Sequence, residues 1–182
     1  MISYSKEYIG NILFLGGLFG KKKSFIYGLE EKDIAISREI MDLLSRVQSN
    51  LNELRTFIDA NDITSINASL SELRNKFILL KSKAEAILVD VQSIMNKEIQ
   101  LKNSILLNDE EYLQDKYQNL NSMVQELDSL IEIIGARPST EELRNEYMGF
   151  MFGKLNSIID SANKIINDDR ELEHVYASID QL

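Results

Sequence analysis

The chain of 182 residues is long enough for one domain with a substantial core, and its 44% apolar and 27% charged residues are typical of folded proteins. The absence of cysteine excludes a disulfide framework, thiolate metal sites and cysteine nucleophiles. A net charge of −9 disfavours general binding to nucleic acid, because an acidic body repels phosphate backbones.

Residues that interrupt helices are rare in this chain. It contains one proline, Pro138, and eight glycines, six of which fall in two clusters at 10–20 and 149–153. Few helix-breaking residues therefore lie between residues 29 and 134. This scarcity predicts long helices and an all-α fold. We expect two parts, an apolar and basic N-terminal segment at 1–28 and a helical body at 29–182.

The N-terminal segment contains the stretch YIGNILFLGGLFGKKKSF at 8–25. Four lysines and one glutamate give residues 1–28 a net charge of +3, so the remainder carries −12. The lysines follow the apolar run, whereas a secretory signal places them before it. The run at 9–19 would span about 16 Å as a helix, too short to cross a bilayer core of about 30 Å.

Two interpretations of this segment remain open. In the first, apolar side chains insert shallowly into a membrane while lysines meet anionic head groups. The contact residues are then Ile12, Leu13, Phe14, Leu15, Leu18, Phe19, Lys21, Lys22 and Lys23. In the second, the same side chains pack on the protein's own core, as a docked helix or as a hairpin turning at Gly16 and Gly17.

A first helix is expected near 30–60, since apolar residues recur there at spacings of three and four from Ile36 to Ile58. Asn61 and Asp62 suit a turn and a new N-cap. The second helix, near 63–107, keeps the same repeat over about six heptads, typical of a coiled coil. Only Glu98 breaks this repeat. It is either a glutamate that snorkels at a frayed end or pairs with a lysine, or a polar residue that fixes the register or faces a partner.

A third helix is expected near 109–135. Its seam consists of Leu113, Tyr117, Leu120, Val124, Leu127, Ile131 and Ile134. Gly135 and Pro138 end it, and Ser139 with Glu142 forms a capping box for a fourth helix near 139–180. Short links between long helices predict an elongated antiparallel four-helix bundle of coiled-coil-like hairpins, in which the second helix extends roughly 20 Å beyond the first.

The sequence GGLFGK at 16–21 has a faint counterpart in GFMFGK at 149–154. Counting along the antiparallel path brings the two stretches to similar levels. We expect them either to pack together through their glycines or to form one exposed apolar tip, with Phe150 and Phe152 as further membrane or partner contacts.

The sequence contains few signals for catalysis, cofactor binding or metal binding. The only histidine, His174, lies three residues after Glu171, but di-iron bundles need two such pairs, so we interpret His174 as a solvent-facing residue. No nucleophile elbow, phosphate-binding loop or calcium loop can be found in the sequence. We therefore expect no catalytic residues, no metal site and no cofactor.

These observations favour a non-enzymatic helical protein that works by self-association or by binding a protein partner through its seams. It would be cytoplasmic and peripheral at an anionic membrane surface. The plan of a short apolar N-terminal piece followed by a long helical hairpin resembles the ESCRT-III and phage-shock membrane-remodelling proteins. The resemblance is limited to architecture, since their first helix is strongly basic and residues 30–59 here are net acidic.

The alternative is a soluble acidic binding module, such as an inhibitor, an immunity protein or a secretion-associated chaperone, with residues 1–28 folded into its core. An acidic surface favours a basic protein partner. The two hypotheses differ on whether residues 9–19 are exposed in the free protein.

Overall fold

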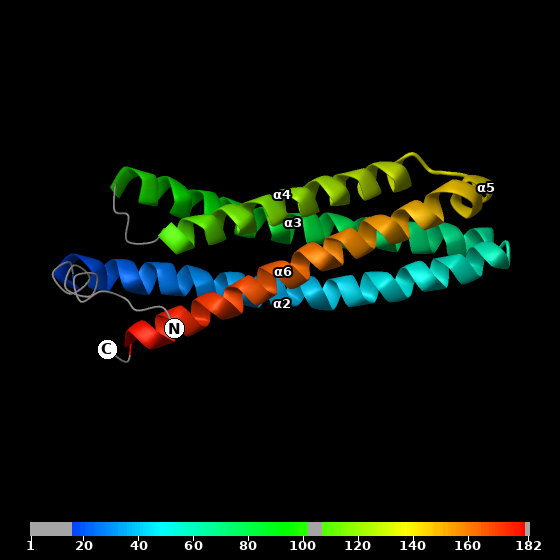
Figure 1. Cartoon of the computed structure of the whole chain (residues 1–182). Helices are drawn as coiled ribbons and strands as arrows, with labels where there is room; N and C mark the ends of the chain where they lie inside the picture. Colours follow the sequence, from blue (N-terminus) through cyan, green and yellow to red (C-terminus); the bar gives the residue numbers. More distant parts are fainter. Residues whose placement is uncertain (1–15, 102–106, 181–182) are drawn as a thin grey trace.

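The computed structural model describes the backbone of residues 16–101 and 107–180, and side chains over 32–93, 95–96, 114–167 and 169. Within these ranges the chain forms helices and turns only, which confirms the all-α prediction (Figure 1). The elements are α2 (Gly16–Asp59), α3 (Ile63–Leu101), α4 (Leu107–Gly135), the short α5 (Thr140–Glu142), the π-helical η2 (Leu143–Tyr147) and α6 (Met148–Asp180).

Helix α2 is longer than the sequence pattern indicated. It begins at Gly16 and includes Gly17, where a hairpin had been one alternative, and it has 44 residues against 39 in α3. The expected overhang of α3 beyond the first helix is therefore wrong. The periodicity of apolar residues fades before residue 30, but lysine and the other straight-chain residues that follow Gly20 are good helix formers.

The turn between α2 and α3 has the expected caps. Asn61 adopts a left-handed conformation with φ of 52°, and the Asp62 amide donates a 3.0 Å hydrogen bond to the Phe57 carbonyl, closing α2. The Asp62 carboxylate then accepts from the Ser65 amide at 3.1 Å, confirming Asp62 as the N-cap of α3. Arg144 joins this turn to η2 by donating to the Ile58 carbonyl and to Asn61 Oδ1, both at 2.8 Å.

The second described turn lies between α4 and α5. Helix α4 ends at Gly135 as expected, but the left-handed residue is Arg137, with φ of 54°, and no described glycine has a positive φ. The Ser139 side chain accepts from the Glu142 amide, and Glu142 accepts from the Ser139 amide at 2.7 Å. These two hydrogen bonds confirm the predicted capping box.

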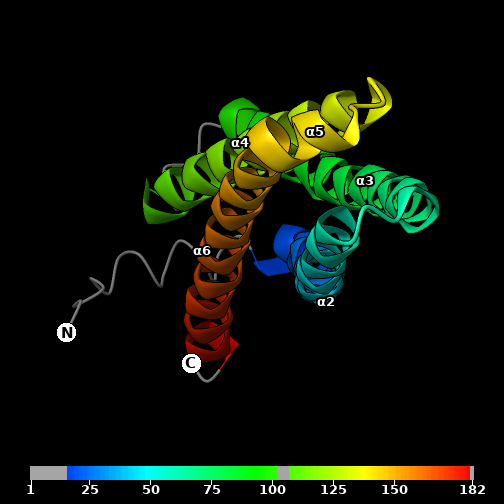
Figure 2. The same ribbon diagram turned by 90° about the vertical axis from the view of Figure 1, so that its right-hand side faces the viewer.

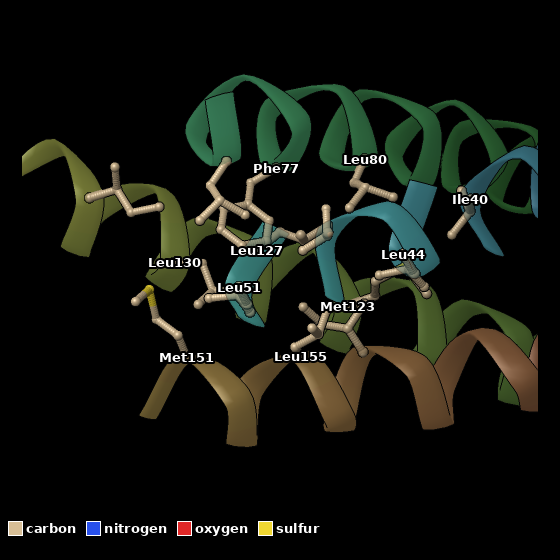
Figure 3. Close-up of a cluster of buried hydrophobic side chains, with 14 of the residues drawn as sticks. Ile40, Leu44, Leu51, Phe77, Leu80, Met123, Leu127, Leu130, Met151 and Leu155 are labelled. Atoms are coloured by element: carbon tan, nitrogen blue, oxygen red, sulfur yellow. The ribbon is translucent and has the colours of Figure 1, made fainter. Parts of the chain in front are cut away.

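The core is built from the predicted seams, and Phe77 is the largest of its fully buried side chains (Figure 3). In α2 and α6 the seam residues with described side chains are buried or half-buried, as predicted. Three details differ. Ile63 is 54% exposed because it starts α3 beside the turn, and in α4 Met123 and Leu130 are buried in place of Val124 and Ile131, which are half-buried.

Four pairs of long helices pack against one another: α2 with α3, α3 with α4, α4 with α6 and α2 with α6. Successive long helices run in opposite directions, and the turns at 60–62 and 136–139 lie at the same end (Figure 1). Figure 2 shows α3 and α6 on different sides of the arrangement, so one face of α3 points away from the other helices.

Candidate interaction surface and buried ionic cluster

The N-terminal residues that the sequence predicted as membrane contacts fall in two groups. Ile12, Leu13, Phe14 and Leu15 lie outside the described residues. Leu18, Phe19 and the three lysines Lys21–Lys23 belong to the first turns of α2, but their side chains are outside the described set. The backbone therefore places the lysines on a helix and leaves the choice between membrane and core untested.

Phe150 and Phe152 lie near the start of α6, and each contacts a cation of the same chain. Phe150 is 43% exposed and has Lys154 Nζ 5.2 Å from its ring centroid. Phe152 is half-buried, with the Arg55 guanidinium 6.0 Å from its ring centroid. These distances are in the range of cation–π contacts, so both rings are partly covered by polar side chains.

The expected meeting of the 16–21 and 149–154 stretches is wrong. Phe152 contacts Arg55 near the C-terminal end of α2, and Gly16 begins α2 about 58 Å away along the helix axis. The estimate placed the third helix too far from the turn at 60–62, whereas η2 lies beside that turn through the hydrogen bonds of Arg144. A methyl group added at Gly149 or Gly153 would meet no described atom within 4 Å, so neither glycine serves a close helix contact.

Glu98 lies in α3, and Glu171 and His174 lie in α6, but all three side chains are outside the described set. The interpretations of Glu98 and His174 therefore stay predictions. Among the described residues, no cluster of three or more histidine or acidic side chains is placed to hold a metal ion. In that part of the chain, no helix has both the length and the apolar character that crossing a membrane requires.

The main exposed apolar surface of the described residues lies on α3. Of the five large hydrophobic side chains that are exposed, Ile78, Leu79 and Val89 share the face of α3 that points away from the core, at 42%, 45% and 61% exposure. Small uncharged residues continue this face in both directions. We call the following eight exposed residues the outward stripe: Ala68, Ser71, Asn75, Ile78, Leu79, Ser82, Ala86 and Val89.

Charged side chains border the outward stripe, and several reach back toward neighbouring helices. Lys83 pairs with Glu39 of α2, and Lys81 Nζ lies 2.6 Å from Asp128 of α4. On the α4 side, Arg74 and Glu85 lie eleven residues apart, about three helical turns, so they share one edge of the stripe. The stripe is thus a strip without charge between two charged edges.

A buried ionic cluster joins α2, α4 and α6 at the other end of the core from the described turns. Lys116 Nζ lies 2.7 Å from Asp169 Oδ1 and 3.9 Å from Asp33 Oδ2. The three residues are only 2–5% exposed. Ser37 donates to Asp169 Oδ2 at 3.4 Å, so each of the three helices contributes at least one polar side chain.

The electrostatics of this cluster are dominated by burial. Removal from water raises the pKa of Asp33 to about 7, against the opposing attraction of Lys116, and the nearby Asp90 and Asp169 raise it further. Asp33 Oδ1 is buried without a hydrogen-bond partner among the described residues. A carboxyl group in this position loses its proton near neutral pH, whereas an ordinary aspartate loses its proton near pH 4 (about 3.9).

Sequence reasoning missed this cluster, although a signal was present. Asp33 precedes Ser37, Ile40 and Leu44 at the helical spacing of the α2 seam, Lys116 precedes Leu120 in α4 in the same way, and Asp169 follows Ile165 in α6. Charged residues thus continue apolar seams in three helices. A seam defined by apolar residues alone leaves these charges out.

The arrangement suits helix alignment better than catalysis. Lys116 is held by the two carboxylates, and its charge is largely neutralised by them. A groove of about 380 Å³ runs beside the cluster between α2 and α6. Its lining is mostly aliphatic and charged and consists of Ile34, Ser37, Arg38, Met41, Asp42, Ile166 and Asp169.

Comparisons with known proteins add no family to this description. No protein-family model matches the chain, and neither the curated proteins nor the solved structures contain a significant match.

Proposed function

We propose that this chain is a non-enzymatic interaction protein that self-associates, built as an elongated antiparallel four-helix bundle with coiled-coil-like hairpins. The outward stripe of α3 is the observation that supports this best. It lies opposite the seam that packs into the core, it carries no charge, and it includes three of the large exposed apolar side chains. Association would remove this surface from water, which stabilises the associated state by about 25 cal/mol for each Å² of apolar area buried.

The self-association part is tested by placing a charge in the stripe. Val89→Glu is expected to abolish concentration-dependent association in sedimentation velocity, because the carboxylate would be desolvated in the contact. Ser157→Glu, at an exposed position of α6, is the matched control and is expected to behave as the unmodified chain. Equal association of both variants would mean that the stripe is not the contact surface.

The second part of the proposal is peripheral attachment to the cytoplasmic face of an anionic membrane through residues 1–28. The apolar run and Lys21–Lys23 support it, since each lysine near an anionic surface contributes about 1 kcal/mol. Self-association would then multiply the number of N-terminal segments per assembly, which strengthens attachment through avidity.

Co-sedimentation with vesicles tests this second part. The full chain is expected to bind vesicles containing anionic lipid and not neutral ones, and a chain without residues 1–28 is expected to stay helical and lose binding. If the deletion instead unfolds the helical body, and the full chain binds neither anionic nor neutral vesicles, residues 1–28 belong to the core. The acidic binding module with a basic protein partner would then be the working function.

A further inference from the structure

The buried ionic cluster lies where α2 and α6 are held together by side chains alone. We propose that it controls a pH-dependent opening of one end of the bundle: when Asp33 loses its proton, α2 and α6 separate at the cluster, while the end with the turns stays closed. This opening is independent of the proposed self-association. It concerns the contact of two helices at one end of the molecule and not the unfolding of the whole chain.

The charges around Asp33 pair one to one only when Asp33 is neutral. Lys32 of α2 lies 3.4 Å from Asp90 of α3. Lys116 of α4 lies 2.7 Å from Asp169 of α6. These two lysines and two aspartates are the described charged groups that act on Asp33 from the four long helices, and their charges cancel. An ionised Asp33 therefore adds a negative charge that no lysine balances, and Lys116, 3.9 Å away, would have to share its charge between two carboxylates.

Burial makes the unbalanced charge unfavourable. Asp33 is 2% exposed, and its Oδ1 atom has no hydrogen-bond partner among the described residues. A buried carboxylate that is incompletely paired costs free energy, and contact with water removes that cost. Burial is accordingly the largest influence on Asp33 and raises its pKa to about 7. The ionised group thus favours an arrangement in which water reaches it.

The topology decides which helices can separate. At the other end of the bundle, the turns at 60–62 and 136–139 join helices, and Arg144 holds the first turn against η2 by two hydrogen bonds of 2.8 Å. No turn joins α2 to α6, because α3 and α4 lie between them in the sequence (Figure 1). The groove of about 380 Å³ already lies between α2 and α6 beside the cluster. Separation along this groove exposes the cluster without breaking a turn.

Proton linkage sets the size of the effect. The closed form binds the proton of Asp33 with a pKa of about 7, and in the open form the group has its ordinary pKa of 3.8. The closed form therefore holds the proton more tightly, and a rise in pH favours the open form. The equilibrium constant for opening is expected to rise about 25-fold between pH 5.5 and pH 7.5 and to level off above about pH 8.

Labelling of single cysteines measures the opening, and the cysteine-free chain makes the signal specific. Ala162→Cys places a thiol in α6 beside Ser37 and Ile40 of α2, at a position that is 3% exposed. Met151→Cys places one in the same helix near the turns, at a position that is fully buried. Each variant reacts with an aromatic disulfide reagent at both pH values and at urea concentrations below the unfolding transition. Dividing by the rate of the urea-unfolded variant at the same pH removes the effect of thiol ionisation.

The relative labelling rate of Ala162→Cys is expected to rise about 25-fold from pH 5.5 to pH 7.5 and to change little with urea, because opening one end exposes little surface. Met151→Cys should react more slowly and with the steep urea dependence of global unfolding. Adding Asp33→Asn to Ala162→Cys should abolish the rise with pH.

Three results would overturn the proposal. Equal rates and equal urea dependence at positions 162 and 151 would mean that the chain opens only by unfolding as a whole. A rate for Ala162→Cys that does not change with pH would exclude control by a proton. A rise that persists in the presence of Asp33→Asn would assign the proton to another group. Circular dichroism checks that each variant is folded, and Ser37→Cys, also at a buried position of the cluster, replaces Ala162→Cys if that variant is not.

Discussion

Replacing Lys116 by methionine is expected to lower the free energy of unfolding at pH 7 by about 3–5 kcal/mol, the usual loss when one partner of a buried ion pair is removed. The variant leaves Asp33 and Asp169 buried without the ammonium group that lies 3.9 Å and 2.7 Å from them. Without Lys116, the effect of burial, which raises the pKa of Asp33, is less opposed, so the loss should be larger at pH 8 than at pH 5. Urea unfolding at these two pH values measures it.

Lys83→Met is the matched control for this prediction. Lys83 also pairs with a carboxylate of a neighbouring helix, Glu39 of α2, but both side chains are partly exposed, at 25% and 57%. Exposed pairs contribute up to about 1 kcal/mol, so this variant is expected to unfold at nearly the same urea concentration as the unmodified chain. If Lys116→Met cost no more than Lys83→Met, the account of a tightly coupled buried cluster would be wrong.

The second large effect is a dependence of stability on pH that originates in Asp33. Its pKa is raised from 3.8 to about 7 in the folded chain, so between these values the folded state holds a proton that the unfolded state has released. The free energy of unfolding therefore falls as the pH rises from about 4 to about 7, by up to roughly 4 kcal/mol, and the contribution is constant above that range.

Asp33→Asn should remove this slope, because asparagine is neutral at every pH and resembles the protonated carboxyl group. We expect the variant to match the unmodified chain near pH 4 and to exceed its free energy of unfolding by about 2–4 kcal/mol at pH 8. Asp160→Asn, at an exposed position of α6, should keep the slope of the unmodified chain. Parallel pH profiles for Asp33→Asn and the unmodified chain would contradict the assignment.

The helices and much of the core could be predicted from the sequence because they depend on local signals. The spacing of apolar residues around Phe77 in α3 requires one buried helix face, and the caps at Asp62 and Ser139 are short-range hydrogen bonds. The choice of Met123 and Leu130 over Val124 and Ile131 could not be predicted. Both pairs fit a helical period, and the position of α4 relative to its neighbours decides between them.

The candidate site was harder to predict, for two different physical reasons. Asp33, Lys116 and Asp169 are far apart in the sequence, and only the packing of three helices brings them together. The outward stripe is defined by the absence of charge on a face that mixes serine and alanine with Ile78 and Val89, so its apolar periodicity is weak. The core face of α3 could be predicted from its apolar repeat, but the opposite face carries no repeat of its own.

The most direct test of self-association is the molar mass of the unmodified chain by light scattering over a dilution series from about 1 mM to about 10 µM, the range in which weak contacts dissociate. The account predicts a mass that rises above the 20.9 kDa of one chain toward twice that value as concentration increases. A mass that stays at one chain over the whole series would contradict self-association.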